Sequence, residues 1–139
     1  MDRMEVTIRT DKQFTDLKPY ISDFLKEKTG TGMLNVFVAH TTCAIKIMEG
    51  EILLLSDVNS YLEHAFPKTG EYRHDIIDIR DVPVNERING FAHMRQLFFD
   101  VSTSIPVEDG KMLLGKWQSV FLVEFDPTRE RKVIFTYHS

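Results

Sequence analysis

The stretch that decides the fold is QSVFLVEF, residues 118–125. Phe121, Val123 and Phe125 alternate with Val120 and Leu122, so a strand formed here carries apolar side chains on both faces. Such a strand must be covered on both sides. In a chain of 139 residues the second cover can come from another subunit, which is a modest first indication of an oligomer.

Further strands and helices are expected around this stretch. Alternating or β-branched runs predict strands at residues 5–9, 33–39, 44–48, 101–107, 112–114 and 132–137. Helical spacing predicts a first helix that is capped by Thr15 or Asp16 and stops near Gly30, a second at 52–66 and a third at about 85–99. The second helix is apolar around much of its circumference, which predicts deep burial. The sequence therefore predicts one domain, residues 1–139, of the mixed α+β class with largely antiparallel sheets.

Composition limits the classes of function. The chain is 42% apolar and 27% charged, as in ordinary globular proteins, and its net charge of −4 disfavours a nucleic-acid partner. No apolar run approaches the roughly 20 residues that cross a bilayer, and no signal peptide is evident, so no membrane partner is expected. A single cysteine cannot form an internal disulfide, which fits a reducing compartment. We expect a cytoplasmic protein.

Three of the five histidines stand beside other polar side chains. His40 ends a buried strand before Thr41 and Thr42, and His74 precedes Asp75 in the irregular stretch 67–83. His93 lies one turn from Asn89 on the predicted third helix. Neutral imidazole can ligate a metal or transfer a proton near pH 7. The chain lacks the sequence motifs that by themselves identify a zinc or nucleotide site. These residues alone therefore indicate a histidine-lined anion or metal site and no more.

Other side chains carry a functional and a structural interpretation. Cys43 is more simply a small buried residue than a nucleophile beside His40. Glu49 is either a general base or a solvated acid at a strand end. Trp117 would more often close a core or an interface. Arg129 and Arg131 are most simply a solvated strand entrance, although either could meet a phosphate.

Three segments in order resemble the YjbQ family, the secondary thiamine-phosphate synthase group. They are His40-Thr41-Thr42-Cys43-Ala44-Ile45 with Glu49, then Tyr72-Arg73-His74-Asp75, then Asn89-Gly90-Phe91-Ala92-His93 followed by Ser102 to Val107, Gly110, Gly115-Lys116-Trp117-Gln118 and Glu124. The ordered set is specific and covers about three-quarters of the chain. The sequence departs from the family pattern at Met48, where the family has Asn or Gln, and at Lys116, where it has Thr or Ser.

The resemblance implies an α+β fold that assembles as a homotrimer, with a pocket at or near the subunit interface. It implies catalytic roles for His40, Glu49, His74 and His93, and a divalent metal, Mg or Zn, on the three histidines. Substrate contacts are implied for the following residues: Thr41, Thr42, Cys43, Asn89, Trp117 and Gln118. The implied reaction joins a pyrimidine pyrophosphate to a thiazole phosphate and releases pyrophosphate, as a weak or secondary activity.

Three functions remain open at this point. The first is the thiamine-phosphate synthase-type transferase. The second is a metal-dependent hydrolase of another phosphorylated small molecule. The third is a non-catalytic trimer that binds an inorganic anion or metabolite, or that scaffolds other proteins.

Overall fold

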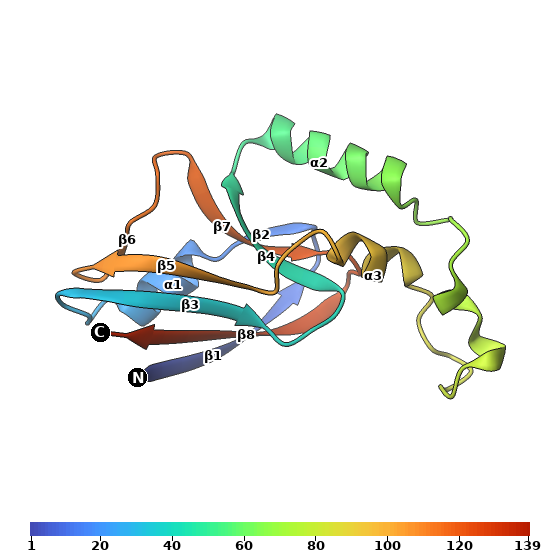
Figure 1. Cartoon of the computed structure of the whole chain (residues 1–139), viewed down its shortest axis with the longest axis horizontal. Helices are drawn as coiled ribbons and strands as arrows, with labels where there is room; N and C mark the ends of the chain where they lie inside the picture. The colour runs from blue at the N-terminus through green and yellow to red at the C-terminus, as the bar shows by residue number, and fades with distance from the viewer.

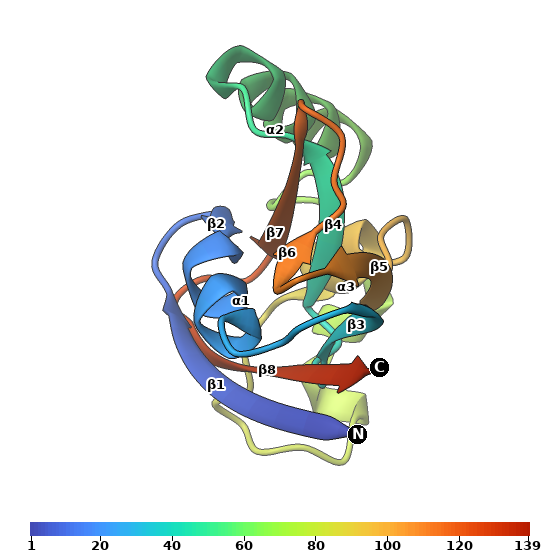
Figure 2. The ribbon, with the colours of Figure 1, turned by 90° about the vertical axis from the view of Figure 1, so that its left-hand side faces the viewer.

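The computed structural model describes residues 1–139, which fold into two antiparallel sheets and three α-helices (Figures 1 and 2). The larger sheet has the order β1-β8-β3-β5-β6. Its strands are β1 (Asp2–Thr10), β8 (Arg129–His138), β3 (Thr31–Val38), β5 (Ser102–Glu108) and β6 (Lys111–Met112). The smaller sheet has the order β2-β7-β4, with β2 (Phe14–Asp16), β7 (Gln118–Glu124) and β4 (Cys43–Glu49). The predicted α+β class with antiparallel sheets is confirmed.

The helices and short turns complete the element order. The α-helices are α1 (Lys18–Leu25), α2 (Ile52–Ala65) and α3 (Gly90–Gln96). Two 3₁₀ turns, η1 (Arg73–Asp75) and η2 (Ile77–Ile79), lie in the stretch that sequence left irregular. No helix has both the length and the apolar character needed to cross a membrane.

Strand β7 separates two hydrophobic cores, as its two apolar faces require. Val120 and Leu122 pack into a core shared with α1 and the larger sheet. Phe121 and Val123 face a second core that α2 and α3 supply. The second cover therefore comes from the same chain, so this strand does not by itself call for another subunit, and the homotrimer stays a prediction.

Helix α2 departs from its prediction of deep burial. Leu62 is its only buried residue, whereas Ile52 and Leu53 are 80% and 71% exposed. Figures 1 and 2 show α2 at the margin of the molecule, away from the larger sheet. The carboxylate of Glu51 caps the start of the helix by accepting the amides of Leu53 and Leu54. Only part of the apolar circumference of α2 packs against the second core.

The boundaries of the other two helices differ from the sequence prediction for local reasons. α3 begins at Gly90 and not near residue 85, because the guanidinium of Arg87 is engaged by the turn at 126–128. α1 ends at Leu25, short of Gly30. Leu17 is its N-cap residue, but the carboxylate of Asp16 accepts the amide of Lys18 at 2.9 Å, so the predicted capping residue still satisfies a free amide.

Candidate functional site

The loop that carries His40 is held by a buried ion pair between β7 and β8. The guanidinium of Arg131 donates through Nε to Glu124 Oε1 at 2.7 Å and through Nη2 to the hydroxyl of Thr42 at 2.7 Å. Both charged side chains are essentially inaccessible, at 1% and 0% exposure. Glu124 also accepts from the hydroxyl of Thr10 and from the amide of Asp126. Because both carboxylate oxygens of Glu124 and two guanidinium nitrogens of Arg131 have partners, this network fixes both the 40–42 loop and the turn after β7.

His40 has a fixed tautomer. Its Nε2 accepts a hydrogen bond from the backbone amide of Lys132 at 2.8 Å, so the neutral ring carries its proton on Nδ1. Partial burial lowers the pKa of His40, and the nearby Arg131 guanidinium lowers it further. At neutral pH the ring is therefore uncharged and offers one N–H donor, at Nδ1.

His74 and His93 lie against each other. Their ring centroids are 4.4 Å apart, with the ring planes at 62°. The pairing arises because η1 packs on the start of α3, where Asp75 Oδ1 accepts the amide of Gly90 at 2.8 Å. The Asp75 carboxylate thus caps α3 and makes no hydrogen bond to its neighbour His74.

Gly90 allows this close packing. A Cβ at residue 90 would lie 2.5 Å from the Cβ of Tyr72 and 2.9 Å from Asp75 Oδ1. The Nη1 of Arg80 donates to the carbonyl of His74 at 2.9 Å and fixes the loop from its other side. These contacts leave the ring nitrogens of His74 and His93 without a protein partner and available to a ligand.

The surroundings of His93 are electropositive. Partial burial lowers the pKa of His93, and repulsion from His74 and from Arg80 acts in the same direction, while the carboxylates of Asp126 and Asp75 oppose it. Both carboxylates are already hydrogen-bonded within the chain. A bound anion would therefore meet the His93 imidazole, whose protonation the free protein disfavours and the anion would favour.

Asp126 connects His93 to the His40 loop. It accepts from Arg87 at 3.0 Å, from Asn89 Nδ2 at 2.9 Å and from Arg129 at 3.4 Å. Arg129 in turn acts on the pKa of His40, while Asp126 acts on that of His93. The buried Asn89 thus positions Asp126 and the turn. Of Arg129 and Arg131, which the sequence offered as possible phosphate contacts, Arg129 is partly exposed and remains open to an anion.

Sequence reasoning missed Arg80, Arg87 and Asp126. Arg87 fell inside the predicted third helix, and Asp126 lies between the two strands predicted at 118–125 and 132–137. Neither position has a motif that distinguishes it from a surface residue. The contacts of Asp126 with Arg87 and Asn89 join residues 37 or more positions apart, so only the fold reveals them.

The predicted metal set is not assembled within one chain. No group of three or more His, Cys, Asp or Glu side chains is arranged to hold a metal ion. Nε2 of His40 is engaged by the Lys132 amide, and only His74 and His93 lie together. A bound Mg or Zn ion remains a prediction, and the chemistry below uses only the side chains of this chain.

Glu49, Trp117 and Gln118 lie at the opposite end of β4 and β7. Cys43 pairs with Glu124 at one end of these strands, and Glu49 pairs with Gln118 at the other. Six residue steps along a strand span about 20 Å. Gln118 accepts the amide of Gly115 at 2.7 Å and closes its own turn, while Trp117 is 66% exposed. One chain therefore does not bring these three residues to the histidines.

The two remaining predicted contact residues differ in accessibility. Thr41 is exposed beside His40. Cys43 is fully buried in the larger core, and burial raises the pKa of its thiol to about 12. The thiol stays protonated at neutral pH and faces the core, which is the structural interpretation that the sequence favoured.

The chain is similar to known proteins along nearly its whole length. The family model described as "UPF0047 protein YjbQ-like" matches residues 2–139. A UPF0047 protein of Methanothermobacter thermautotrophicus is 38% identical over 133 residues, covering 93% of this chain and 86% of that protein. A second, from Archaeoglobus fulgidus, is 34% identical and covers 94% of this chain and 97% of its own length.

Solved structures agree with the sequence matches. A hypothetical protein from Aeropyrum pernix superposes with a TM-score of 0.86 at 30% identity, covering 100% of this chain and 99% of its own. A YjbQ/UPF0047 protein from Clostridium acetobutylicum superposes with a TM-score of 0.82 at 30% identity, covering 97% and 99%. The fold is thus shared along nearly the whole chain.

Proposed function

Because the chain belongs to the UPF0047 family of YjbQ-like proteins, we propose that the His40, His74 and His93 end of β4 binds a phosphorylated small molecule and catalyses transfer of the thiamine-phosphate synthase type. The observation that carries this proposal is the His74–His93 pair. Two partly buried imidazoles 4.4 Å apart, with free ring nitrogens and flanking arginines, form a site for an anion.

The donors suit a pyrophosphate group. His40 offers Nδ1–H, Arg129 offers a partly exposed guanidinium, and the His74–His93 pair offers ring nitrogens without a protein partner. The aromatic and apolar Phe91, Phe99 and Phe125 lie behind this end of the molecule, in the second core. Rigid donors at a partly desolvated site stabilise charge more strongly than water does.

The proposed transfer needs this stabilisation at its leaving group. The methylene carbon of the pyrimidine pyrophosphate loses its bond to the pyrophosphate oxygen and forms one to the thiazole nitrogen. The electron pair of the broken bond leaves with pyrophosphate, whose negative charge the imidazolium and guanidinium groups then share. The attacking nitrogen carries no proton, so this reaction needs no general base.

A second candidate, hydrolysis of a phosphorylated small molecule, is favoured by one specific observation. The lowered pKa of His93 keeps this ring neutral at pH 7, which is the state that accepts a proton from water. Hydrolysis would use that capacity, whereas the transfer would not. Formation of thiamine phosphate from the two precursors, against release of phosphate or pyrophosphate from either alone, distinguishes the two reactions.

The site is tested by calorimetric titration of the protein with inorganic pyrophosphate. A charge-assisted hydrogen bond contributes about 1.5–3 kcal/mol, so we expect H93N to weaken binding by about 10- to 100-fold. H138Q is the matched control, since His138 is exposed at the far end of β8, and it should bind as the unmodified protein does. Equal affinity in H93N and in the unmodified protein would contradict the site.

Turnover separates the reaction from the binding. If pyrophosphate binds at this site but neither transfer nor hydrolysis is detected with the unmodified protein, the non-catalytic anion-binding function is supported. If thiamine phosphate forms and H93N abolishes its formation while H138Q does not, the transferase is supported.

A further inference from the structure

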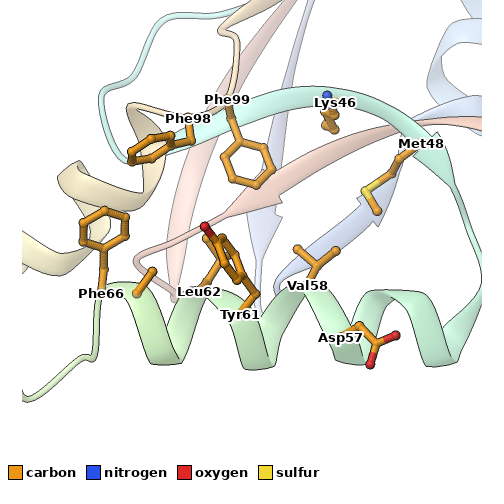
Figure 3. A pocket seen from close by; sticks show the side chains of 10 residues that line it. Lys46, Met48, Asp57, Val58, Tyr61, Leu62, Phe66, Phe98 and Phe99 are labelled. Carbon is orange, nitrogen blue, oxygen red and sulfur yellow. The ribbon is translucent and has the colours of Figure 1, made fainter.

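A cavity of about 460 Å³ lies between α2 and β4 (Figure 3). Its lining is apolar or aromatic apart from two charged side chains, Lys46 and Asp57. Figure 3 shows Tyr61, Phe98 and Phe99 toward one end of the cavity, and the two charged residues toward the other. An apolar cavity of this size with a few polar groups is typical of a small-molecule site. Nothing in the predicted site or in the proposed transfer uses this cavity.

The aromatic end of the cavity is held in place by contacts within the chain. Phe98 stacks on Phe66 with ring centroids 5.5 Å apart, and Phe99 packs on Phe125 at 5.0 Å. Arg95 donates to the carbonyl of Phe66 from Nε at 3.0 Å and from Nη2 at 2.8 Å, which fixes the end of α2. A ligand ring would therefore meet aromatic walls that are already in position, and binding would not have to order them.

The register of β4 places Lys46 on the cavity side of the strand. Side chains alternate along a strand, so Lys46 shares a face with Ala44 and Met48, which both belong to the second core. The ammonium group of Lys46 makes no ion pair within the chain. An inward lysine on an edge strand such as β4 can also discourage strand pairing, but that role requires no acid on the opposite wall.

Asp57 stands on that opposite wall, on α2, and is also without a partner. The two other acids at this helix are engaged, because Glu51 caps it and Glu63 pairs with Arg95. Lys46 and Asp57 thus line one cavity from facing elements with opposite charges, and no ion pair forms between them. A ligand with a single charge would be attracted by one of these groups and repelled by the other. A ligand that carries both an anionic and a cationic group can satisfy both.

We propose that the cavity binds a small aromatic zwitterion of the amino-acid type. Its ring packs among Tyr61, Phe98 and Phe99, its carboxylate pairs with Lys46, and its ammonium group pairs with Asp57. Tyr61 and Phe98 are 69% and 70% exposed, so a bound ring removes their apolar surface from water. None of the three histidines lines this cavity, and the inference does not rest on the proposed function.

The test is an NMR titration of the full chain with L-phenylalanine and with two singly charged analogues. Phenylpropionate lacks the ammonium group, and phenethylamine lacks the carboxylate. An ion pair at a partly exposed position contributes up to about fivefold in affinity, so we expect L-phenylalanine to bind about fivefold more tightly than either analogue.

Two variants assign each charge of the ligand to its partner. K46Q should remove the advantage of L-phenylalanine over phenethylamine, and D57N should remove its advantage over phenylpropionate. K12Q and D78N are the matched controls, since Lys12 and Asp78 are exposed outside the cavity, and both should leave all three affinities unchanged.

A third variant fills the space that the ligand ring would occupy. Ala65 lines the cavity from α2, so A65F should abolish binding of all three compounds. A39F is its control, because Ala39 is exposed outside the cavity. K46Q and D57N change exposed side chains and keep the test valid if A65F fails to fold.

Three results would overturn the proposal. They are no binding of L-phenylalanine, binding that a folded A65F retains, and an affinity for L-phenylalanine that neither K46Q nor D57N changes. An analogue that binds as tightly as L-phenylalanine would also contradict it, because one charge would then suffice. Binding of L-phenylalanine without binding of pyrophosphate would instead contradict only the proposed function.

Discussion

The two ends of β4 differ in how they are completed. At the Cys43 end, the Arg131–Glu124 pair satisfies its charges with Thr10, Thr42 and the turn at 126–128, all within the chain. At the Glu49 end, exposed apolar groups on α2 and an exposed Trp117 have no cover within the chain. Buried charged groups must be paired within the fold, whereas exposed apolar surface can be covered by another molecule. The first end is therefore held by polar contacts within the chain, and the second leaves apolar side chains exposed.

The largest effect is expected where the polar end is broken. R131A leaves the buried Glu124 carboxylate without its cation, and removal of one partner of a buried pair costs about 3–5 kcal/mol. The free energy of unfolding, measured by urea denaturation, should fall by that amount. R3A removes an exposed pair with Glu5 and should change stability by less than about 1 kcal/mol. A loss for R131A as small as that for R3A would mean that the network does not hold this end.

A smaller effect is expected from G90A. The added methyl group must displace Tyr72 and the Asp75 carboxylate, and such overpacking costs about 1–3 kcal/mol. The change should also separate His74 from His93, so the imidazole resonances of both should shift in NMR spectra while those of His138 do not. Unchanged imidazole spectra would show that η1 and α3 do not depend on each other at Gly90.

The smallest effect is the pH dependence of stability. The pKa values of His40 and His93 are lowered in the folded protein relative to the ordinary value of about 6.5, so the folded state binds fewer protons than the unfolded chain. Stability is therefore fully present above about pH 6.5 and falls as the pH drops below that value. The melting temperature should decrease between pH 7 and pH 5.5, and H93N should reduce the slope. A slope unaffected by H93N would remove His93 as a source of this dependence.

Sequence predicted the fold to the extent that local patterns determine it. The alternation in 118–125 fixed β7 and its two faces, and the apolar runs placed β3, β4 and α2 correctly in type. The short β2 was missed, because three residues carry no periodicity. The prediction that α2 is deeply buried was wrong, because the sequence pattern shows which side chains of the helix are apolar and not what covers them.

The candidate site was predicted in part. The pairing of His74 with His93 agrees with the expected convergence of the histidines, and His40 belongs to the same end through Asp126 and Arg129. Glu49, Trp117 and Gln118 resembled members of the same motif set, but the antiparallel register of β4 and β7 places them about 20 Å from Cys43. Long-range registers and side-chain hydrogen bonds such as Arg87 to Asp126 have no signature in a single sequence.

The most direct test of the proposed anion site is the pKa of His93, measured by NMR titration with and without inorganic pyrophosphate. Repulsion from His74 and Arg80 lowers this pKa in the free protein, and a bound anion reverses the sign of the local potential. The account predicts that the pKa of His93 rises on addition of pyrophosphate, while that of His138 stays constant. A His93 pKa that is the same with and without saturating pyrophosphate would contradict it.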